Sequence, residues 1–144
     1  MEYPVYGTSD YRNPAVEILQ ENGSRISEFK YISHEITDGK PELAGLPATY
    51  VEEPEEAQTL CLRLKDEVTG IVLELLYSIF SGKGILARSA RFINEGIVPV
   101  HLLNAMSLSL DLPDSDYVWM QFSGVWARER HIIERKLEQG IQAV

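Results

Sequence analysis

One segment near the end of the chain gathers residue types that could recognise a ligand or a partner. It reads Trp126-Ala127-Arg128-Glu129-Arg130-His131. An indole beside guanidinium groups can stack on a sugar ring and hydrogen-bond its hydroxyls, or anchor a protein interface. On a strand, Trp126, Arg128 and Arg130 would share one face. We therefore predict these three as interface or sugar-proximal residues. An interface or ion-paired structural role is the simpler interpretation, and direct sugar contact is the alternative.

The other candidate motifs do not assemble a catalytic site. Ser123-Gly124 lacks the Gly-x-Ser-x-Gly pattern of a nucleophile elbow, and Gly82-Lys83-Gly84 lacks the spacing of a phosphate-binding loop. No Cys/His or two-carboxylate arrangement stands out. The histidines lie far apart, without the spacing of a zinc site, at positions His34, His101 and His131. We predict that the chain carries no catalytic residue.

A run of aspartates, Asp111, Asp114 and Asp116, is the one metal-like cluster. Close carboxylates can hold calcium, but the EF-hand pattern is absent and aspartate is a favoured turn residue. We predict no metal site and no cofactor.

The single cysteine excludes an internal disulfide and fits a reducing compartment. Cys61 stands within an alternating strand pattern, which predicts a small buried side chain. The first residues show neither a basic nor an apolar leader region, so no signal peptide is predicted. These observations lead us to expect a cytoplasmic protein.

Composition and charge narrow the class of partner. The formal net charge is −9 and the pI about 4.8. Such a chain repels phosphate backbones and anionic lipid surfaces, so we expect neither nucleic acid nor membrane as a partner. No apolar stretch approaches the roughly 20 residues of a membrane-spanning helix. Neutral sugars, cations and protein surfaces remain open.

The elements that must position these residues are strands. Turn-forming residues recur every 8–12 residues or so, as in an antiparallel sandwich. Asn22-Gly23 predicts a hairpin between the first two strands, and residues 41–56 are expected to form a loop. The chain is predicted to be an all-β, antiparallel β-sandwich, with strands over residues 15–20, 25–36, 60–65, 71–80, 85–93, 99–112, 117–122 and 126–137.

Several segments, in order, resemble the N-terminal domain of the family 36 α-galactosidases. They are residues 2–7, 33–36, 39–41, 45–52, 87–92, 107–112 and, most specific, 123–131. The resemblance covers nearly the whole chain. It implies a β-supersandwich, similar to galactose mutarotase, of which residues 1–144 would be an incomplete part. It also implies a larger glycosidase whose (β/α)₈ barrel is absent here, together with both carboxylates of its retaining chemistry.

The resemblance further implies a role and partners. The chain would be a non-catalytic accessory and oligomerisation domain of an enzyme that hydrolyses terminal α-galactosides of the melibiose and raffinose type. Its partners would be the barrel of the parent chain and other subunits, with α-galactosides bound through the parent. Unpaired sheet edges favour a homo-oligomer. Two alternatives remain: a pure assembly module, and a free-standing carbohydrate-binding sandwich with an aromatic platform from Trp119, Trp126 or Tyr117.

Overall fold

The computed structural model describes residues 2–7, 13–45, 48–113, 116–140 and 142. Within them the chain is all-β and antiparallel, which confirms the predicted fold class, and no helix is long and apolar enough to cross a membrane. It divides into two compact units, residues 1–109 and 110–144. The elements are β1 (Val16–Leu19), β2 (Lys30–Asp38), η1 (Pro54–Glu56), β3 (Ala57–Lys65), β4 (Ile71–Phe80), β5 (Ile85–Asn94), β6 (His101–Ala105), β7 (Val118–Val125) and β8 (Arg128–Lys136).

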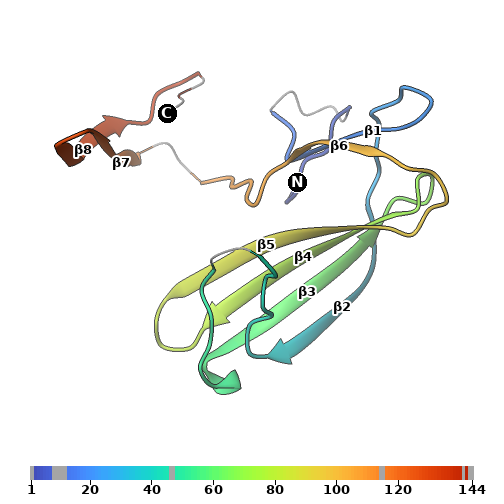
Figure 1. Cartoon of the computed structure of the whole chain (residues 1–144), viewed down its shortest axis with the longest axis horizontal. Helices are drawn as coiled ribbons and strands as arrows, with labels where there is room; N and C mark the ends of the chain where they lie inside the picture. Colours follow the sequence, from blue (N-terminus) through green and yellow to red (C-terminus); the bar gives the residue numbers. More distant parts are fainter. Residues whose placement is uncertain (1, 8–12, 46–47, 114–115, 141, 143–144) are drawn as a thin grey trace. The chain divides into compact units, whose positions relative to one another are not determined.

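A four-stranded meander, in the order β2-β3-β4-β5, dominates the first unit (Figure 1). A turn at residues 66–70 joins β3 to β4, and a turn at residues 81–84 joins β4 to β5. Asp66, 1% exposed, accepts the backbone N–H groups of Val68 and Thr69 through Oδ1, at 2.9 and 3.3 Å. Such local capping by aspartate fixes the turn between β3 and β4. The long β3–β4 and β4–β5 ladders follow without register shifts.

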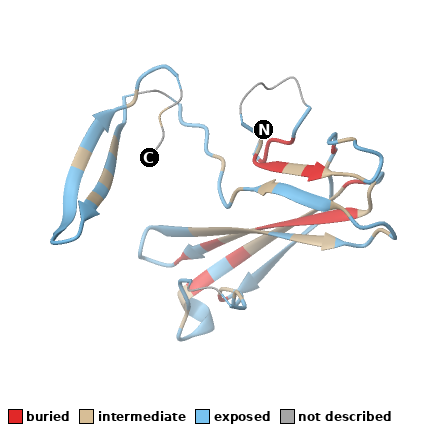
Figure 2. Ribbon diagram, turned by 45° about the horizontal axis from the view of Figure 1, so that its top comes forward, coloured by how far each residue is buried: buried red, intermediate tan, exposed pale blue. Residues whose placement is uncertain are grey.

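The core lies on one face of this meander. Alternate β4 side chains, Ile71, Leu73 and Leu75, are at most 3% exposed. They belong to one apolar cluster with buried residues of the small β1–β6 sheet and of the segment that leads into it. These residues are Val16 and Ile18 in β1, and Tyr3, Val5 and Ala15 before it. Figure 2 shows the buried residues gathered in the sheets of this unit. Two apolar layers packed face to face form the expected sandwich arrangement.

Charged side chains occupy the opposite face of the meander. Glu74 forms ion pairs with Arg63 at 3.0 Å and with Arg91 at 3.1 Å, from the strands on either side. Glu95 continues the network to Arg63 and Lys65. These cross-strand pairs fix the order and register of β3, β4 and β5 on a polar face.

A buried arginine ties the entry segment to the end of the first unit. The Arg88 side chain is 5% exposed, and its guanidinium lies 5.6 Å from the ring centre of Tyr3 and 5.1 Å from that of Tyr77. It donates a hydrogen bond to the Ser109 carbonyl at 3.2 Å and pairs with Glu2. Burial, and then the hydrogen bond to Glu2, raise the pKa of Tyr77 to about 12.

Two predicted strand features were wrong. Asn22-Gly23 does form a turn, with the Gly23 N–H donating to the Gln20 carbonyl at 3.0 Å, but its flanks do not pair as a hairpin. Instead β1 pairs with β6 and β2 with β3. The apolar residues of β1 are buried in the core because β1 pairs with the distant strand β6 and not with the next strand in the sequence. The strand predicted over residues 99–112 covers only His101–Ala105, because β1 offers it a partner of only four residues.

Candidate functional site

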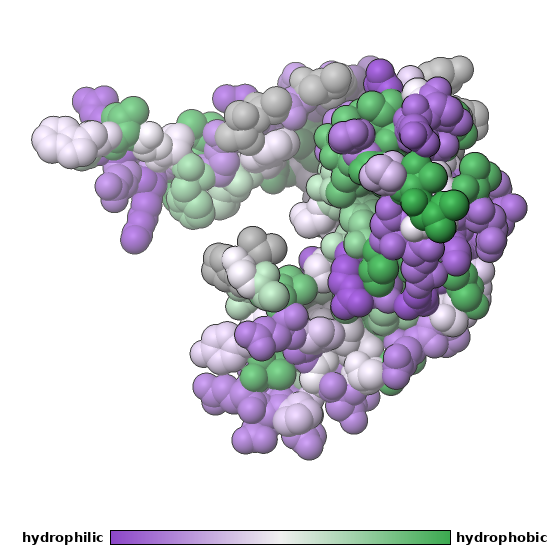
Figure 3. Space-filling model, turned by 45° about the vertical axis from the view of Figure 1, so that its right-hand side comes forward, coloured by the Kyte–Doolittle hydropathy of each residue, from purple (hydrophilic) through white to green (hydrophobic). Residues whose placement is uncertain are grey.

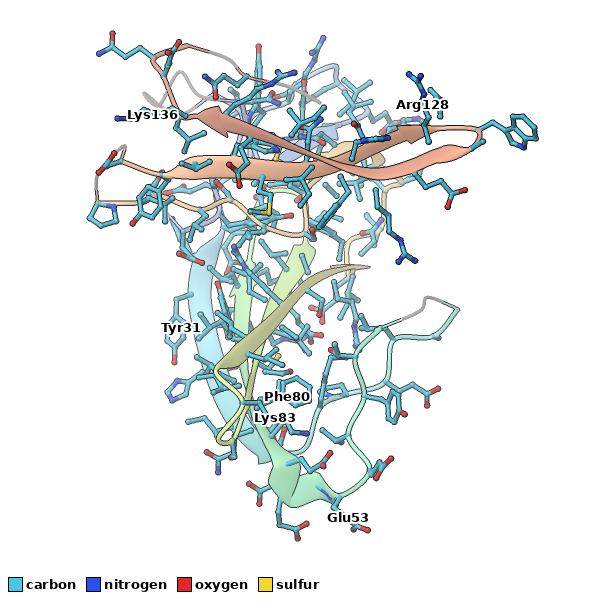
Figure 4. The ribbon with its side chains drawn as sticks, turned by 90° about the vertical axis from the view of Figure 1, so that its left-hand side faces the viewer. Tyr31, Glu53, Phe80, Lys83, Arg128 and Lys136 are labelled. Atoms are coloured by element: carbon cyan, nitrogen blue, oxygen red, sulfur yellow. The ribbon has the colours of Figure 1, made fainter. Side chains whose placement is uncertain are left out.

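The predicted site residues lie in the β7–β8 hairpin of the second unit. β7 and β8 pair antiparallel from Val118↔Lys136 to Val125↔Arg128. Figure 4 labels Arg128 near one end of the hairpin and Lys136 near the other. Strands were predicted over 117–122 and 126–137, and both are confirmed with shifted ends. The second strand begins two residues later than predicted, because Trp126 and Ala127 form the turn between β7 and β8.

The turn presents the indole of Trp126 to solvent, with 95% of the residue exposed. Ala127 follows with φ of 60°, in the left-handed region that a side chain with Cβ enters at a cost of about 1–2 kcal/mol. A tight turn held in a left-handed conformation fixes the direction in which its exposed side chain projects. Trp126 therefore stands at the tip of the hairpin rather than on a strand face.

A bulge in β8 changes the orientation of the arginines. Ser123 pairs with His131 and Val125 with Arg128, so β8 contains one residue more than β7 between these pairs. Arg130 adopts φ of 60° there. Gly124 faces the bulge, where an added Cβ would lie 2.6 Å from the Arg128 carbonyl oxygen. The predicted common face of Trp126, Arg128 and Arg130 is therefore wrong, because strict alternation ends at a bulge.

Both guanidinium groups are accessible. Arg128 and Arg130 are exposed, and within the described part of the chain neither forms an ion pair. The ion-paired structural role, which belongs to the simpler interpretation of the sequence, has no partner among the described residues. A cavity of about 310 Å³ beside the tip is lined by Ser123, Gly124, Val125, Arg128 and His131. An exposed indole with two unpaired cations can stack on a ring or bind carboxylates and hydroxyls.

Sequence reasoning missed the apolar face of the same hairpin. Val118, Met120, Phe122 and Ile132 are each between 55% and 68% exposed, and Phe122 is paired directly with Ile132. The period-2 alternation of β7 could have identified this face. The other face is better covered, because Trp119 helps line a cavity of about 380 Å³ together with Leu110, Asp111, Leu112, Leu137, Glu138, Gly140 and Gln142 of the same unit. A two-stranded hairpin is only marginally stable by itself.

The remaining candidates do not form a second site. Asp114 of the aspartate run lies outside the described residues, and Asp116 pairs with Lys136 at 3.3 Å. Among the described residues no cluster could hold a metal ion. His34 hydrogen-bonds the Tyr31 hydroxyl at 2.6 Å, and the histidines lie on three different strands.

The cysteine is less buried than predicted. Cys61 is only partly buried, because it lies on the charged face of the meander, in register with Leu76 and Glu35. Burial, followed by the nearby Glu74 carboxylate, raises the pKa of its thiol. A raised pKa leaves the thiol protonated and weakly nucleophilic, which argues against a catalytic cysteine.

Comparison with known proteins identifies the family of the whole chain. All of the chain, residues 1–144, matches the glycosyl hydrolase family 36 N-terminal domain. The chain belongs to that family. The resemblance predicted from its motifs is thereby confirmed, including the segment that carries Trp126, Arg128 and Arg130.

Relatives of this family 36 domain are α-galactosidases. It is 46% identical over 142 residues to α-galactosidase AgaA of Geobacillus stearothermophilus, covering 99% of this chain and 20% of AgaA. It is 35% identical over 141 residues to Mel36A of Lactobacillus acidophilus, covering 98% and 19%. The crystal structure of AgaA superimposes with a TM-score of 0.95 over 99% of this chain. That of the Lactobacillus brevis α-galactosidase does so with a TM-score of 0.93, at 43% identity, over 98% of this chain and 19% of its own. The chain thus spans about one fifth of the relatives it matches.

Proposed function

We propose that residues 1–144 form part of the β-supersandwich of a larger α-galactosidase, as a non-catalytic accessory and assembly domain. The enzyme would hydrolyse terminal α-galactosides of the melibiose and raffinose type with retention. One observation carries this proposal: 99% of the chain aligns with AgaA at 46% identity, yet covers only 20% of that enzyme. AgaA variants have been crystallised with raffinose and with stachyose, which supports this substrate class.

The chemistry of the reaction supports a non-catalytic role. Retention requires two carboxyl groups about 5 Å apart, one as nucleophile and one as acid and base. In a (β/α)₈ barrel such groups lie at the carboxyl ends of barrel strands. The described strands of this chain are all antiparallel, so they supply no part of such a barrel. The chain by itself should therefore leave melibiose and raffinose intact, whereas the full-length enzyme hydrolyses both and retains the anomeric configuration.

The β7–β8 hairpin is the proposed contact between this domain and its surroundings in a cytoplasmic homo-oligomer. Its apolar face would pack on the rest of the parent chain. The exposed tip with Trp126, Arg128 and Arg130 would contact the catalytic barrel or a neighbouring subunit. Tryptophan and arginine are the residues whose removal most often weakens protein interfaces.

Replacement of the tip residues in the full-length enzyme tests this role. Trp126→Ala and Arg128→Ala are expected to weaken subunit association at least about 30-fold, the equivalent of roughly 2 kcal/mol. Sedimentation velocity gives the assembly state, and kinetics on melibiose give KM and kcat. Tyr50→Ala removes a similarly exposed aromatic residue, 74% exposed, from the first unit and should change neither. An intact assembly with normal kinetics in both tip variants would contradict the proposal.

The 95% exposure of Trp126 also favours a second candidate, a carbohydrate-binding module. An indole of this kind can stack on a galactose ring. Raffinose added to the chain should then quench its tryptophan fluorescence. The same addition to the Trp126→Ala variant should cause no quenching. An intact assembly with a raised KM for raffinose in the full-length variant would likewise assign the tip to sugar rather than to a subunit.

A further inference from the structure

Three connections at one end of the first unit enclose a groove of about 460 Å³. They are the turn at residues 20–23, the turn between β3 and β4, and the segment that leads from β5 to β6. The last two of these connections begin at strands of the four-stranded sheet, β3 and β5. All residues that line the groove lie in the first unit. Its volume falls in the range of sites that bind small molecules.

Hydrogen bonds within and between the loops fix the walls of this groove. Besides the turn it caps, buried Asp66 accepts the Glu28 N–H through its other carboxylate oxygen, at 3.4 Å. Asn94 accepts the Gly96 N–H at 2.9 Å and donates to the Val98 carbonyl at 3.0 Å. The Glu95 N–H donates to the Gly70 carbonyl at 3.2 Å and joins two of the three connections. The loops therefore hold their shape without an occupant.

Two glycines let the turns approach each other. A Cβ on Gly70 would lie 2.8 Å from the Cα of Gly96, and a Cβ on Gly96 would clash with the Thr69 carbonyl. Contacts of this kind leave no room for a side chain at either position. The groove is preorganised, so an occupant would not have to order it on binding.

The rim of the groove exposes apolar side chains that the described residues of the first unit leave uncovered. Val68 is 85% exposed and Ile97 is exposed in full, at 101%, while Val98 adds a further 37%. Figure 3 shows how apolar side chains interrupt the polar surface in separate patches. Rigid loops that hold aliphatic groups in water are typical of interaction sites.

The charge of the groove selects its occupant. Glu21 and Glu67 are exposed among the lining residues, and the described lining holds no lysine or arginine. A rim that combines exposed aliphatic side chains with two carboxylates suits a long basic side chain, whose stem covers apolar surface while its charged end meets carboxylates. A second copy of this chain, with its net charge of −9, is a poor electrostatic match.

We infer that this groove receives a lysine- or arginine-bearing loop of the parent enzyme, from outside residues 1–144. The inference rests on the proposed function, because the relatives are about five times as long as this chain and most of their surface lies elsewhere. Glu67 and Glu21 pair with the basic group, and Val68, Ile97 and Val98 contact its stem. The groove is thereby one of the contacts that fix this domain on the rest of the enzyme.

Amide hydrogen exchange in the full-length enzyme tests the inference. Peptides that span residues 94–100 should exchange at least about tenfold more slowly in the wild type than in Glu67→Lys. Ile97→Asp should accelerate the same peptides. Glu53→Lys is the matched control, because it reverses another exposed carboxylate that lies outside the groove and should leave these peptides unchanged. Glu67 and Ile97 are exposed, so both variants should keep the circular dichroism spectrum of the wild type.

Three results would overturn it. Exchange of these peptides at the same rate in the wild type, in Glu67→Lys and in Ile97→Asp would show that Glu67 and Ile97 contact no occupant of the groove. Protection that appears only with added raffinose would assign the groove to sugar. Protection that is lost on dilution together with oligomer dissociation would assign it to another subunit. Activity on melibiose, measured on the same samples, tests the proposed function separately from the groove.

Discussion

The two units of the chain contain strands of similar pattern but different burial. In β4, Ile71, Leu73 and Leu75 alternate and are at most 3% exposed, because β1, β6 and the entry segment cover them. In β7, Val118, Met120 and Phe122 alternate in the same way and are at least 55% exposed. The pattern encodes an apolar face in both cases, whereas stability follows from what covers that face. The first unit therefore contains its own core, and the second has an apolar face that the described residues of its own unit leave exposed.

Core truncation should separate the units most strongly. Leu73→Ala removes a side chain that is 1% exposed and should lower the free energy of unfolding by about 3 kcal/mol, through lost burial and the cavity left behind. Phe122→Ala, at 68% exposure, should cost under about 0.5 kcal/mol. Urea unfolding followed by far-UV circular dichroism measures both values. Similar losses for the two variants would show that the hairpin has a core of its own in this chain.

A glycine replacement in each unit sharpens the same contrast. Gly96→Ala forces a Cβ against the Thr69 carbonyl between two fixed turns, and we expect a loss of about 2 kcal/mol. Gly124→Ala meets the Arg128 carbonyl at 2.6 Å, but the hairpin can open at its bulge, so the global loss should stay below about 0.5 kcal/mol. Both tryptophans lie in the second unit. Their fluorescence emission should therefore change in Gly124→Ala and stay the same in Gly96→Ala. The opposite assignment of signals would contradict this division.

The sequence predicted what is local and missed what is distant. Alternation and turn residues located β3, β4 and β5 because each pairs with its neighbour along the chain. The pairing of β1 with β6 joins residues about 85 positions apart, and no local pattern encodes such a partner. The site residues Trp126, Arg128 and Arg130 were found by residue type. Their common face was wrong because the turn at Trp126-Ala127 and the bulge at Arg130 are departures from period 2 that composition does not mark.

Alkaline titration should affect the first unit through Tyr77. The pKa of Tyr77 is raised from 10.0 to about 12, chiefly by burial, so the folded state favours the neutral phenol. This contribution to stability is complete below pH 10 and is lost as the pH rises through about 12. The free energy of unfolding should therefore fall over this window, and Tyr77→Phe should make the fall shallower. Burial also raises the pKa of Tyr3, so part of the slope should persist. Identical slopes in the variant and the wild type would contradict the assignment to Tyr77.

Removal of the hairpin tip should have the smallest effect on the chain itself. Trp126 is 95% exposed, so Trp126→Ala removes almost no buried area, and the free energy of unfolding should change by less than about 0.5 kcal/mol. Calorimetric melting of this chain measures the change. The large aromatic group would then be retained for something other than the stability of these residues, which agrees with the proposed contact in the full-length enzyme. A loss above about 1 kcal/mol would mean that the indole packs within residues 1–144, and the tip would no longer be available to a barrel, a subunit or a sugar.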